Sequence, residues 1–288
     1  MRATLSERRR ITIAATALAF AVLIGVPQLL HAQDWRTISQ SRQAGDETAL
    51  RVDVEYAAGE LRLGQAAAGS LYRMTMRYDD DLITPRVAYR NGRLSVGMEN
   101  TQIKGRSTKG GFLDLKLGAS VPLDLHLKFG AAEANLDLGG MHVSRAAIAT
   151  GASSTKLTVS APNAGSCDLL ELEVGAARFE ATRLGNLNAR RMTMHGGVGE
   201  VTLDFTGQWQ QDMIGKIDMG LGSLTLRLPR GLGVSIRKGG LLASFDSQGL
   251  VKRGDVHYSE NWDSATHKLS LEINAALGSI NVVWVDSQ

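Results

Sequence analysis

The sequence predicts an all-β solenoid that follows an N-terminal signal or anchor helix. Three observations support this prediction: a basic N-terminus precedes an apolar run, apolar and polar residues alternate through much of the remaining chain, and strands led by glycine recur at nearly equal intervals. Alternation has the period of a β-strand, and repetition at such intervals is typical of chains whose strands stack on their neighbours. With 43% hydrophobic residues among 288, the chain is neither disordered nor collagen-like.

Residues 1–32 have the pattern of a secretory signal peptide or a membrane anchor. Three arginines, Arg8 to Arg10, precede an uncharged run from Ile11 to Leu30, and Ala32 supplies a small residue where signal peptidase cuts. The run is just long enough to span a bilayer, so an uncleaved anchor stays open, although Pro27 favours cleavage over a continuing helix. Either way, the positive-inside rule places the chain after about residue 33 outside the cytoplasm: in the periplasm, on the outer face of the membrane, or secreted.

The remaining chain is electrically neutral and poor in cysteine. The whole sequence carries 32 basic and 29 acidic residues, and removing the four arginines and one glutamate of its first ten positions leaves 28 of each. A neutral remainder argues against a nucleic-acid partner. One cysteine excludes a disulfide framework, and the apolar neighbours of Cys167 predict a buried, unreactive thiol.

The polar stretch 33–47 lacks any apolar period and is interpreted as a flexible linker, so the folded domain is expected over 48–288. Its first segment alternates strictly from Leu50 to Tyr56. Less regular strands follow, and the Asn91-Gly92 pair between two of them predicts a tight hairpin. No helical period appears in this part of the sequence.

The glycine-led strands carry the prediction of a stack. Glycine tolerates the backbone conformations and close approach that a repeated corner demands, so we assign these residues as structural turns: Gly130, Gly151, Gly175, Gly197 and Gly220. The next related strand begins only at Ala276, more than twice the usual interval after Gly220, so we expect an irregular insertion at 233–268 that forms a hairpin or a cap. Ordinary hairpin turns in a β-sandwich are the alternative, but those recur at shorter intervals.

Three stretches resemble the toast-rack family of bacterial envelope proteins, which is related to the C-terminal domain of LiaF-type proteins. They are LYRMTMRYDDDLITPRVAYRNGRLSVG at 71–97, the glycine-rich 197–237, and YSENWDSATHKLSLEINAALGSINV at 258–282. The resemblance implies a right-handed, single-stranded β-solenoid without known catalysis. LiaF-type members are implied to restrain an envelope-stress sensor kinase from several membrane helices. This chain has one apolar segment, so the signalling partner is not carried over.

Side chains that could perform chemistry are sparse. The histidines form no metal-binding pattern, and Asp79-Asp80-Asp81 is expected to be a solvated loop, because consecutive aspartates of an extended chain cannot converge on one ion. No cofactor or metal is expected. A carbohydrate-active β-helix is the enzymatic alternative, with these residues as candidates: Asp137, Asp204, Asp218 and Arg227.

The function expected from these features is that of a non-catalytic, exported envelope module that acts structurally or by protein interaction, including a role in envelope-stress sensing. The alternatives are a carbohydrate-binding or carbohydrate-active protein and a surface adhesin. Trp262 and Trp209 are the candidate surface interaction residues, because an exposed aromatic ring can stack on a sugar or a protein. The expected partner is an unknown envelope protein or a glycan, with membrane contact only through residues 11–30 if they remain attached.

Overall fold

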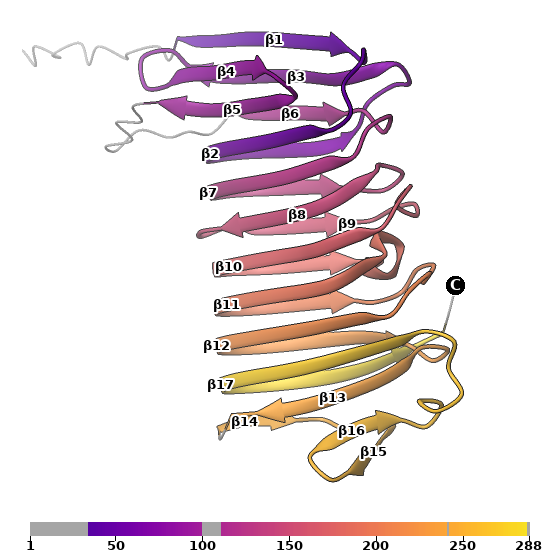
Figure 1. Ribbon diagram of the computed structural model, residues 1–288. Helices are drawn as coiled ribbons and strands as arrows, with labels where there is room; N and C mark the ends of the chain where they lie inside the picture. The colour runs from indigo at the N-terminus through magenta and orange to yellow at the C-terminus, as the bar shows by residue number, and fades with distance from the viewer. Residues whose placement is uncertain (1–33, 100–110, 241, 287–288) are drawn as a thin grey trace, which may run out of the picture. The chain divides into compact units, whose positions relative to one another are not determined.

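The computed structural model describes residues 34–99, 111–240 and 242–286, which form 17 strands and one short 3₁₀ helix (Figure 1). The prediction of an all-β chain is confirmed. The signal or anchor predicted over 1–32 lies outside the described residues. The strands are β1 (Trp35–Gln43), β2 (Leu50–Gln65), β3 (Ser70–Asp79), β4 (Thr84–Arg90), β5 (Arg93–Glu99), β6 (Phe112–Leu117), β7 (Leu123–Asp137), β8 (Val143–Thr150), β9 (Ser154–Thr158), β10 (Cys167–Thr182), β11 (Ala189–Asp204), β12 (Met213–Pro229), β13 (Gly233–Gly239), β14 (Leu242–Phe245), β15 (Leu250–Arg253), β16 (Val256–Ser259) and β17 (Lys268–Val285); the helix η1 is Leu184–Leu187.

The long strands stack in parallel, each in register with the next. Strand β10 pairs with β11 from Cys167 opposite Ala189 to Ala181 opposite Leu203. Strand β11 pairs with β12 in the same way, and β12 with β17. Figure 1 shows these strands lying side by side from β2 and β7 through β12 to β17. The strands inside this stack are therefore hydrogen-bonded along their backbones to a neighbour on each side.

Each long strand is bent in the middle. The part before the bend is called its first arm and the part after the bend its second arm. On β7 the buried residues are odd-numbered from Leu123 to Phe129 and even-numbered from Ala132 to Leu136. The change of parity at Gly130 keeps the apolar side chains of both arms on the interior, because successive side chains of a strand point to opposite faces. Strand β8 lies between the first arms of β7 and β10 and pairs with both, whereas β9 lies between their second arms and pairs with both.

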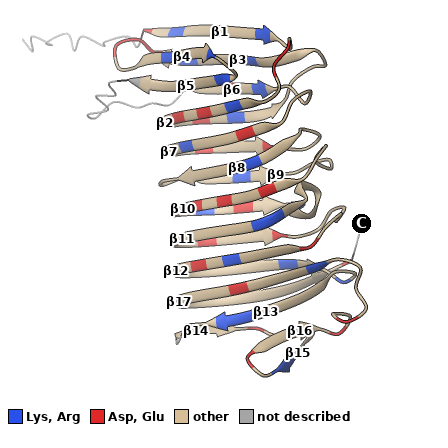
Figure 2. Ribbon diagram, viewed as in Figure 1, with Lys and Arg blue, Asp and Glu red and all other residues tan. Residues whose placement is uncertain are grey.

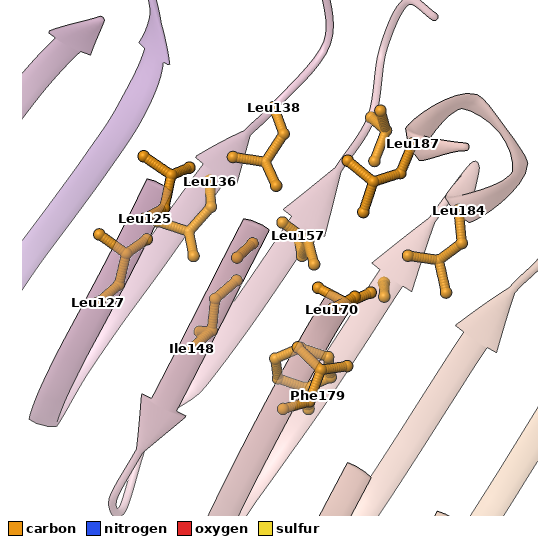
Figure 3. Packing of buried hydrophobic residues seen from close by; sticks show 14 of the residues in the cluster. Leu125, Leu127, Leu136, Leu138, Ile148, Leu157, Leu170, Phe179, Leu184 and Leu187 are labelled. Atoms are coloured by element: carbon orange, nitrogen blue, oxygen red, sulfur yellow. The ribbon is translucent and has the colours of Figure 1, made fainter. Parts of the chain in front are cut away.

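The core lies between the first and second arms and consists of rows of apolar side chains. Figure 3 shows Leu127 and Ile148 of the first arms together with Leu136 and Leu157 of the second arms. Full burial of one such side chain contributes about 1.5–3 kcal/mol. One row, in register across seven strands and at most 1% exposed, is formed by Val54, Leu127, Ile148, Leu172, Met194, Ile217 and Ile273.

At both ends of the stack the strands do not follow the order of the chain. Strand β17 lies between β12 on one side and β13 and β14 on the other. Likewise β2 lies between β7 and the pair β5 and β6. The long interval between Gly220 and Ala276 therefore reflects a strand that returns to pair with β12.

The irregular insertion predicted at 233–268 is only partly irregular. The expected hairpin is present, since β15 and β16 pair antiparallel. In contrast, β13 and β14 pair in parallel with β17 and add another pair of arms to the stack, so the prediction of irregular structure was wrong for them. The interval between glycines could not reveal this, because it measures distance along the chain and not adjacency in the sheet.

The N-terminal part of the domain is mixed: β1 and β6 pair antiparallel with β3, and β4 pairs antiparallel with β5, whereas β2 pairs in parallel with β5 and β6. The flexible linker predicted over 33–47 was wrong for 35–43, because these residues form β1, which pairs with β3. Most side chains of β1 are exposed, so the segment has no apolar alternation by which its sequence could be recognised as a strand. The hairpin at Asn91-Gly92 is confirmed: β4 and β5 pair antiparallel on either side of it, and both residues have positive φ, 47° and 70°. Within the described part of the chain, no helix reaches the length and apolar character needed to cross a membrane.

Candidate functional site

The five glycines predicted as turns stand in one column at the bend of the strands. A Cβ atom on Gly220 would lie 2.6 Å from the carbonyl oxygen of Gly197, and one on Gly175 would lie 2.8 Å from that of Gly151. A Cβ atom on Gly130 would also lie 2.6 Å from the carbonyl oxygen of Ala57. Neighbouring backbones thus approach too closely here for a side chain. This column occupies one edge of the described domain.

The two tryptophans proposed for surface contacts lie in different surroundings. Trp209 is half-buried, and its indole nitrogen donates a hydrogen bond to the carbonyl oxygen of Phe205 at 2.9 Å. Trp262 is also half-buried. The centroid of its ring lies 5.3 Å from that of Tyr258, and the Lys268 ammonium lies 5.3 Å from the Trp262 ring centroid. The structure does not bring the two tryptophans together on one strand or in one hollow among the described residues.

The acidic residues considered for glycosidase chemistry serve local roles. Asp137 and Asp204 belong to the same row, but Thr158 and Thr182 stand between them. Three strand spacings separate their backbones by about 14 Å, whereas a glycosidase holds its two carboxyl groups about 5–10 Å apart. The Asp137 carboxylate accepts backbone hydrogen bonds from Gly139 and Ser160.

The other ionisable candidates are likewise paired. Asp204 lies 3.4 Å from the Arg227 guanidinium, and Asp218 lies 3.4 Å from His195 and accepts a hydrogen bond from Asn274. In the acidic loop, Asp80 pairs with Arg36 at 3.0 Å.

Burial raises the pKa of the Cys167 thiol to about 12, and the prediction of a buried cysteine is confirmed. No group of three or more metal-ligating side chains occurs among residues 34–99, 111–240 and 242–286.

A hollow of the described surface runs over the first arms beside β8. It comprises a depression of about 610 Å³ and an adjoining one of about 280 Å³, which together we call the β8 groove. Its floor is formed by Ala147 and Ala149, which face outward on β8. Longer side chains of β7 and β10 stand on either side at the same register positions. The groove therefore exists because methyl groups alternate with long polar side chains across the sheet.

The walls of the β8 groove are charged and mainly acidic. Glu171 and Glu173 of β10 form one wall, and Lys128 of β7 stands on the other, with Glu55 of β2 beyond it. None of these four side chains forms an ion pair with another described residue. Asp53, the remaining carboxylate, is paired with both Arg51 and Arg93. Figure 2 shows several acidic residues on β10, a basic residue on β8, and both acidic and basic residues on β2 and β7.

A buried threonine lines the groove near the bend. Thr150 lies in register between Phe129 and Val174, where its neighbours carry larger apolar side chains. The residue is only 7% exposed, and its Oγ1 has no hydrogen-bond partner among the described residues. Thr150 shares the inward face of β8 with Ala146 and Ile148, so its hydroxyl points into the core and away from the alanine floor of the groove.

One family model covers most of the chain. The model described as the N-terminal domain of toast_rack, DUF2154, matches residues 31–180 and, in a second overlapping match, residues 169–227. The chain belongs to the toast-rack family. The predicted resemblance is thus confirmed. The residues that line the β8 groove of this toast-rack chain all fall within the matched ranges.

Solved structures with similar chains include a candidate cell adhesion protein from Clostridium sporogenes ATCC 15579, with 14% identity and a TM-score of 0.44 over 87% of the toast-rack chain and 100% of that chain. A candidate adhesin from Bacteroides fragilis NCTC 9343 has 16% identity and a TM-score of 0.43 over 86% and 97%. A candidate lipid-binding protein from Parabacteroides distasonis ATCC 8503 has 13% identity and a TM-score of 0.26 over 87% and 98%. No curated protein matches the chain.

Sequence analysis did not find the β8 groove. The signal was present in the segment Arg145-Ala-Ala-Ile-Ala-Thr150, where both outward positions after Arg145 are alanine. In the neighbouring strands of the toast-rack domain the same positions hold charged or polar residues. Aligning the repeated segments on their glycines therefore shows that this strand alone has short side chains at both positions.

Proposed function

We propose that this protein is an exported, non-catalytic module of the cell envelope, built as a right-handed β-solenoid of the toast-rack type, which binds a partner in the β8 groove. The observation that carries the proposal is the groove itself: a hollow with an alanine floor and three carboxylates, Glu55, Glu171 and Glu173, that lack ion pairs within the described residues. Unpaired charges around a concave surface are available for a partner, because no internal ion pair has to be broken first.

Export is the part of the proposal supported by the sequence. The basic residues before the apolar run Ile11–Leu30 favour translocation of the following domain to the periplasm, the outer face of the membrane or the medium. A single buried cysteine suits an oxidising compartment, where exposed unpaired thiols are disfavoured. The parallel register of the long strands and their parity change at the bend support the solenoid.

Interaction rather than catalysis is supported by the roles of the candidate acidic residues. Asp137 holds a loop backbone and Asp204 pairs with Arg227, so neither is free to act as an acid or base. A role in envelope-stress sensing is suggested by the resemblance to LiaF-type proteins alone and names no partner.

A crosslinking pull-down from intact cells tests this proposal with the full-length protein. Replacing Ala149→Trp fills the floor of the groove, and Thr225→Trp adds the same side chain at an outward position on the second arm of β12. The proposal expects one or more envelope partners to be captured by the wild type and by T225W, and lost from A149W. Equal capture by all three proteins, or no specific capture by any, would overturn it.

A further inference from the structure

We propose that the β8 groove binds an extended polypeptide segment that carries lysine or arginine at alternate positions. This inference rests on the proposed function, which it deepens by naming the chemistry of the partner. The lining contains four carboxylates, from Asp53, Glu55, Glu171 and Glu173, against the single ammonium of Lys128. Asp53 is already neutralised by two arginines, so the attraction comes from the three glutamates.

The spacing of the two glutamates of β10 selects an extended partner. Glu171 and Glu173 are two residues apart on one face of the strand, which places their side chains about 7 Å apart. Alternate side chains of an extended peptide have the same spacing, so two basic residues at positions i and i+2 can each face one carboxylate. A helical partner repeats its faces at three and four residues and does not match this pair.

The width of the groove fits one extended chain. The walls on β7 and β10 are two strand spacings apart, about 10 Å, with only Ala147 and Ala149 between them. Lys128 repels basic side chains from the β7 wall, so they lie toward β10. His126, held by Asp124 at 3.0 Å, and His195, which lies 3.4 Å from Asp218, also border the groove.

The test measures binding of a capped octapeptide of alternating lysine and serine to the full-length protein by calorimetry at low salt. The variant E171Q/E173Q removes both charges of the β10 wall with almost no change of shape. The matched control is E133Q/E180Q, because Glu133 and Glu180 are exposed, form no ion pair among the described residues, and lie on second arms, away from the groove. Circular dichroism and thermal unfolding of every variant establish that each is folded.

The proposal expects the groove variant to bind the peptide roughly tenfold more weakly than the wild type, while the control variant changes the affinity less than about twofold. K128A is expected to bind more tightly, because it removes the repelling charge. An octapeptide of the sequence Lys-Lys-Ser-Ser-Lys-Lys-Ser-Ser has the same charge but no two lysines at positions i and i+2, and it is expected to bind more weakly. Equal losses in the two double variants, or no preference between the peptides, would overturn the inference.

Failure of this inference is distinguishable from failure of the proposed function. If A149W loses its cellular partner while E171Q/E173Q keeps it, the groove is a partner site but the chemistry proposed here is wrong. A neutral glycan that binds the wild type and E171Q/E173Q equally would give that result. If A149W also keeps its partner, both proposals fail.

Discussion

Gly278 of β17 lies directly beside Gly222 of β12, and a Cβ atom on Gly278 would overlap the carbonyl oxygen of Gly222. Gly222 stands in the same relation to Gly199 of β11. All three have positive φ, between 133° and 142°. A second column of glycines therefore accompanies the predicted one at the bend, two positions further along each strand.

Replacement of Gly222 by alanine is expected to destabilise the domain by at least about 2 kcal/mol, because alanine is strained at this φ and its methyl group meets backbone that cannot move alone. Gly254→Ala is the control: that residue also has positive φ, 63°, but no atom lies within 4 Å of the added Cβ. We expect a cost of about 1 kcal/mol there. Urea unfolding of both variants measures the difference, and equal costs would show that close approach at the bend is unimportant.

The regular middle of the domain was predictable because each of its strands repeats one local pattern. The column from Gly130 to Gly220 and the inward rows follow from glycine spacing and alternation alone. The ends were not predictable in the same way, since the pairing of β17 with β12 joins segments that are distant along the chain and leaves no local signature. The β8 groove was missed for a different reason: a hollow depends on differences in side-chain length between neighbouring strands.

A further feature outside the reach of the glycine pattern is a buried asparagine in the turn opposite the bend. Asn186 is 3% exposed; its side chain donates to the carbonyl oxygen of Val159 at 2.8 Å and accepts from the backbone N–H of Gln208 at 2.7 Å. It thus links three successive turns. Asn163, one repeat earlier in the chain, also bonds backbone groups with its side chain, and this recurrence is the sequence signal that could have revealed both.

Replacement of Asn186 by alanine is expected to destabilise the domain by about 1–3 kcal/mol, since it leaves the buried carbonyl of Val159 without this partner and removes the hydrogen bond to the part-buried N–H of Gln208. Asn135→Ala, at an exposed position of β7, is expected to change stability by less than about 0.5 kcal/mol. Denaturant unfolding of the two variants tests this. A small effect at Asn186 would mean that water replaces its side chain.

The Cys167 thiol is expected to resist alkylation in the folded protein at mildly alkaline pH. Burial raises its pKa to about 12, so the reactive thiolate is nearly absent at mildly alkaline pH, and the side chain is inaccessible as well. Labelling with iodoacetamide, followed by intact mass, should show no adduct in the native protein and a single adduct in denaturant. Rapid labelling of the native protein would contradict the burial of this residue.

Glu47 is expected to stabilise the fold in a pH-dependent manner. Its carboxylate accepts hydrogen bonds from the Gly45 backbone N–H, the Arg42 guanidinium and the Tyr89 hydroxyl, which together lower its pKa from 4.5 to about 2. A lowered pKa means that the contribution is complete above the unfolded value of 4.5 and is lost as the pH falls toward 2. Glu47→Gln should therefore be less stable than the wild type at neutral pH, with the difference shrinking through this window.

Urea midpoints of the wild type and the Glu47→Gln variant, measured from neutral pH down to about 2, test the expected window. The exposed Glu133→Gln variant is the control, because its carboxyl group forms no hydrogen bond or ion pair with another described residue. A difference between wild type and E47Q that stays constant with pH would show that the glutamate acts through its shape and neutral hydrogen bonds. In that case the charge of Glu47 does not stabilise the contact between β4 and the segment before β2.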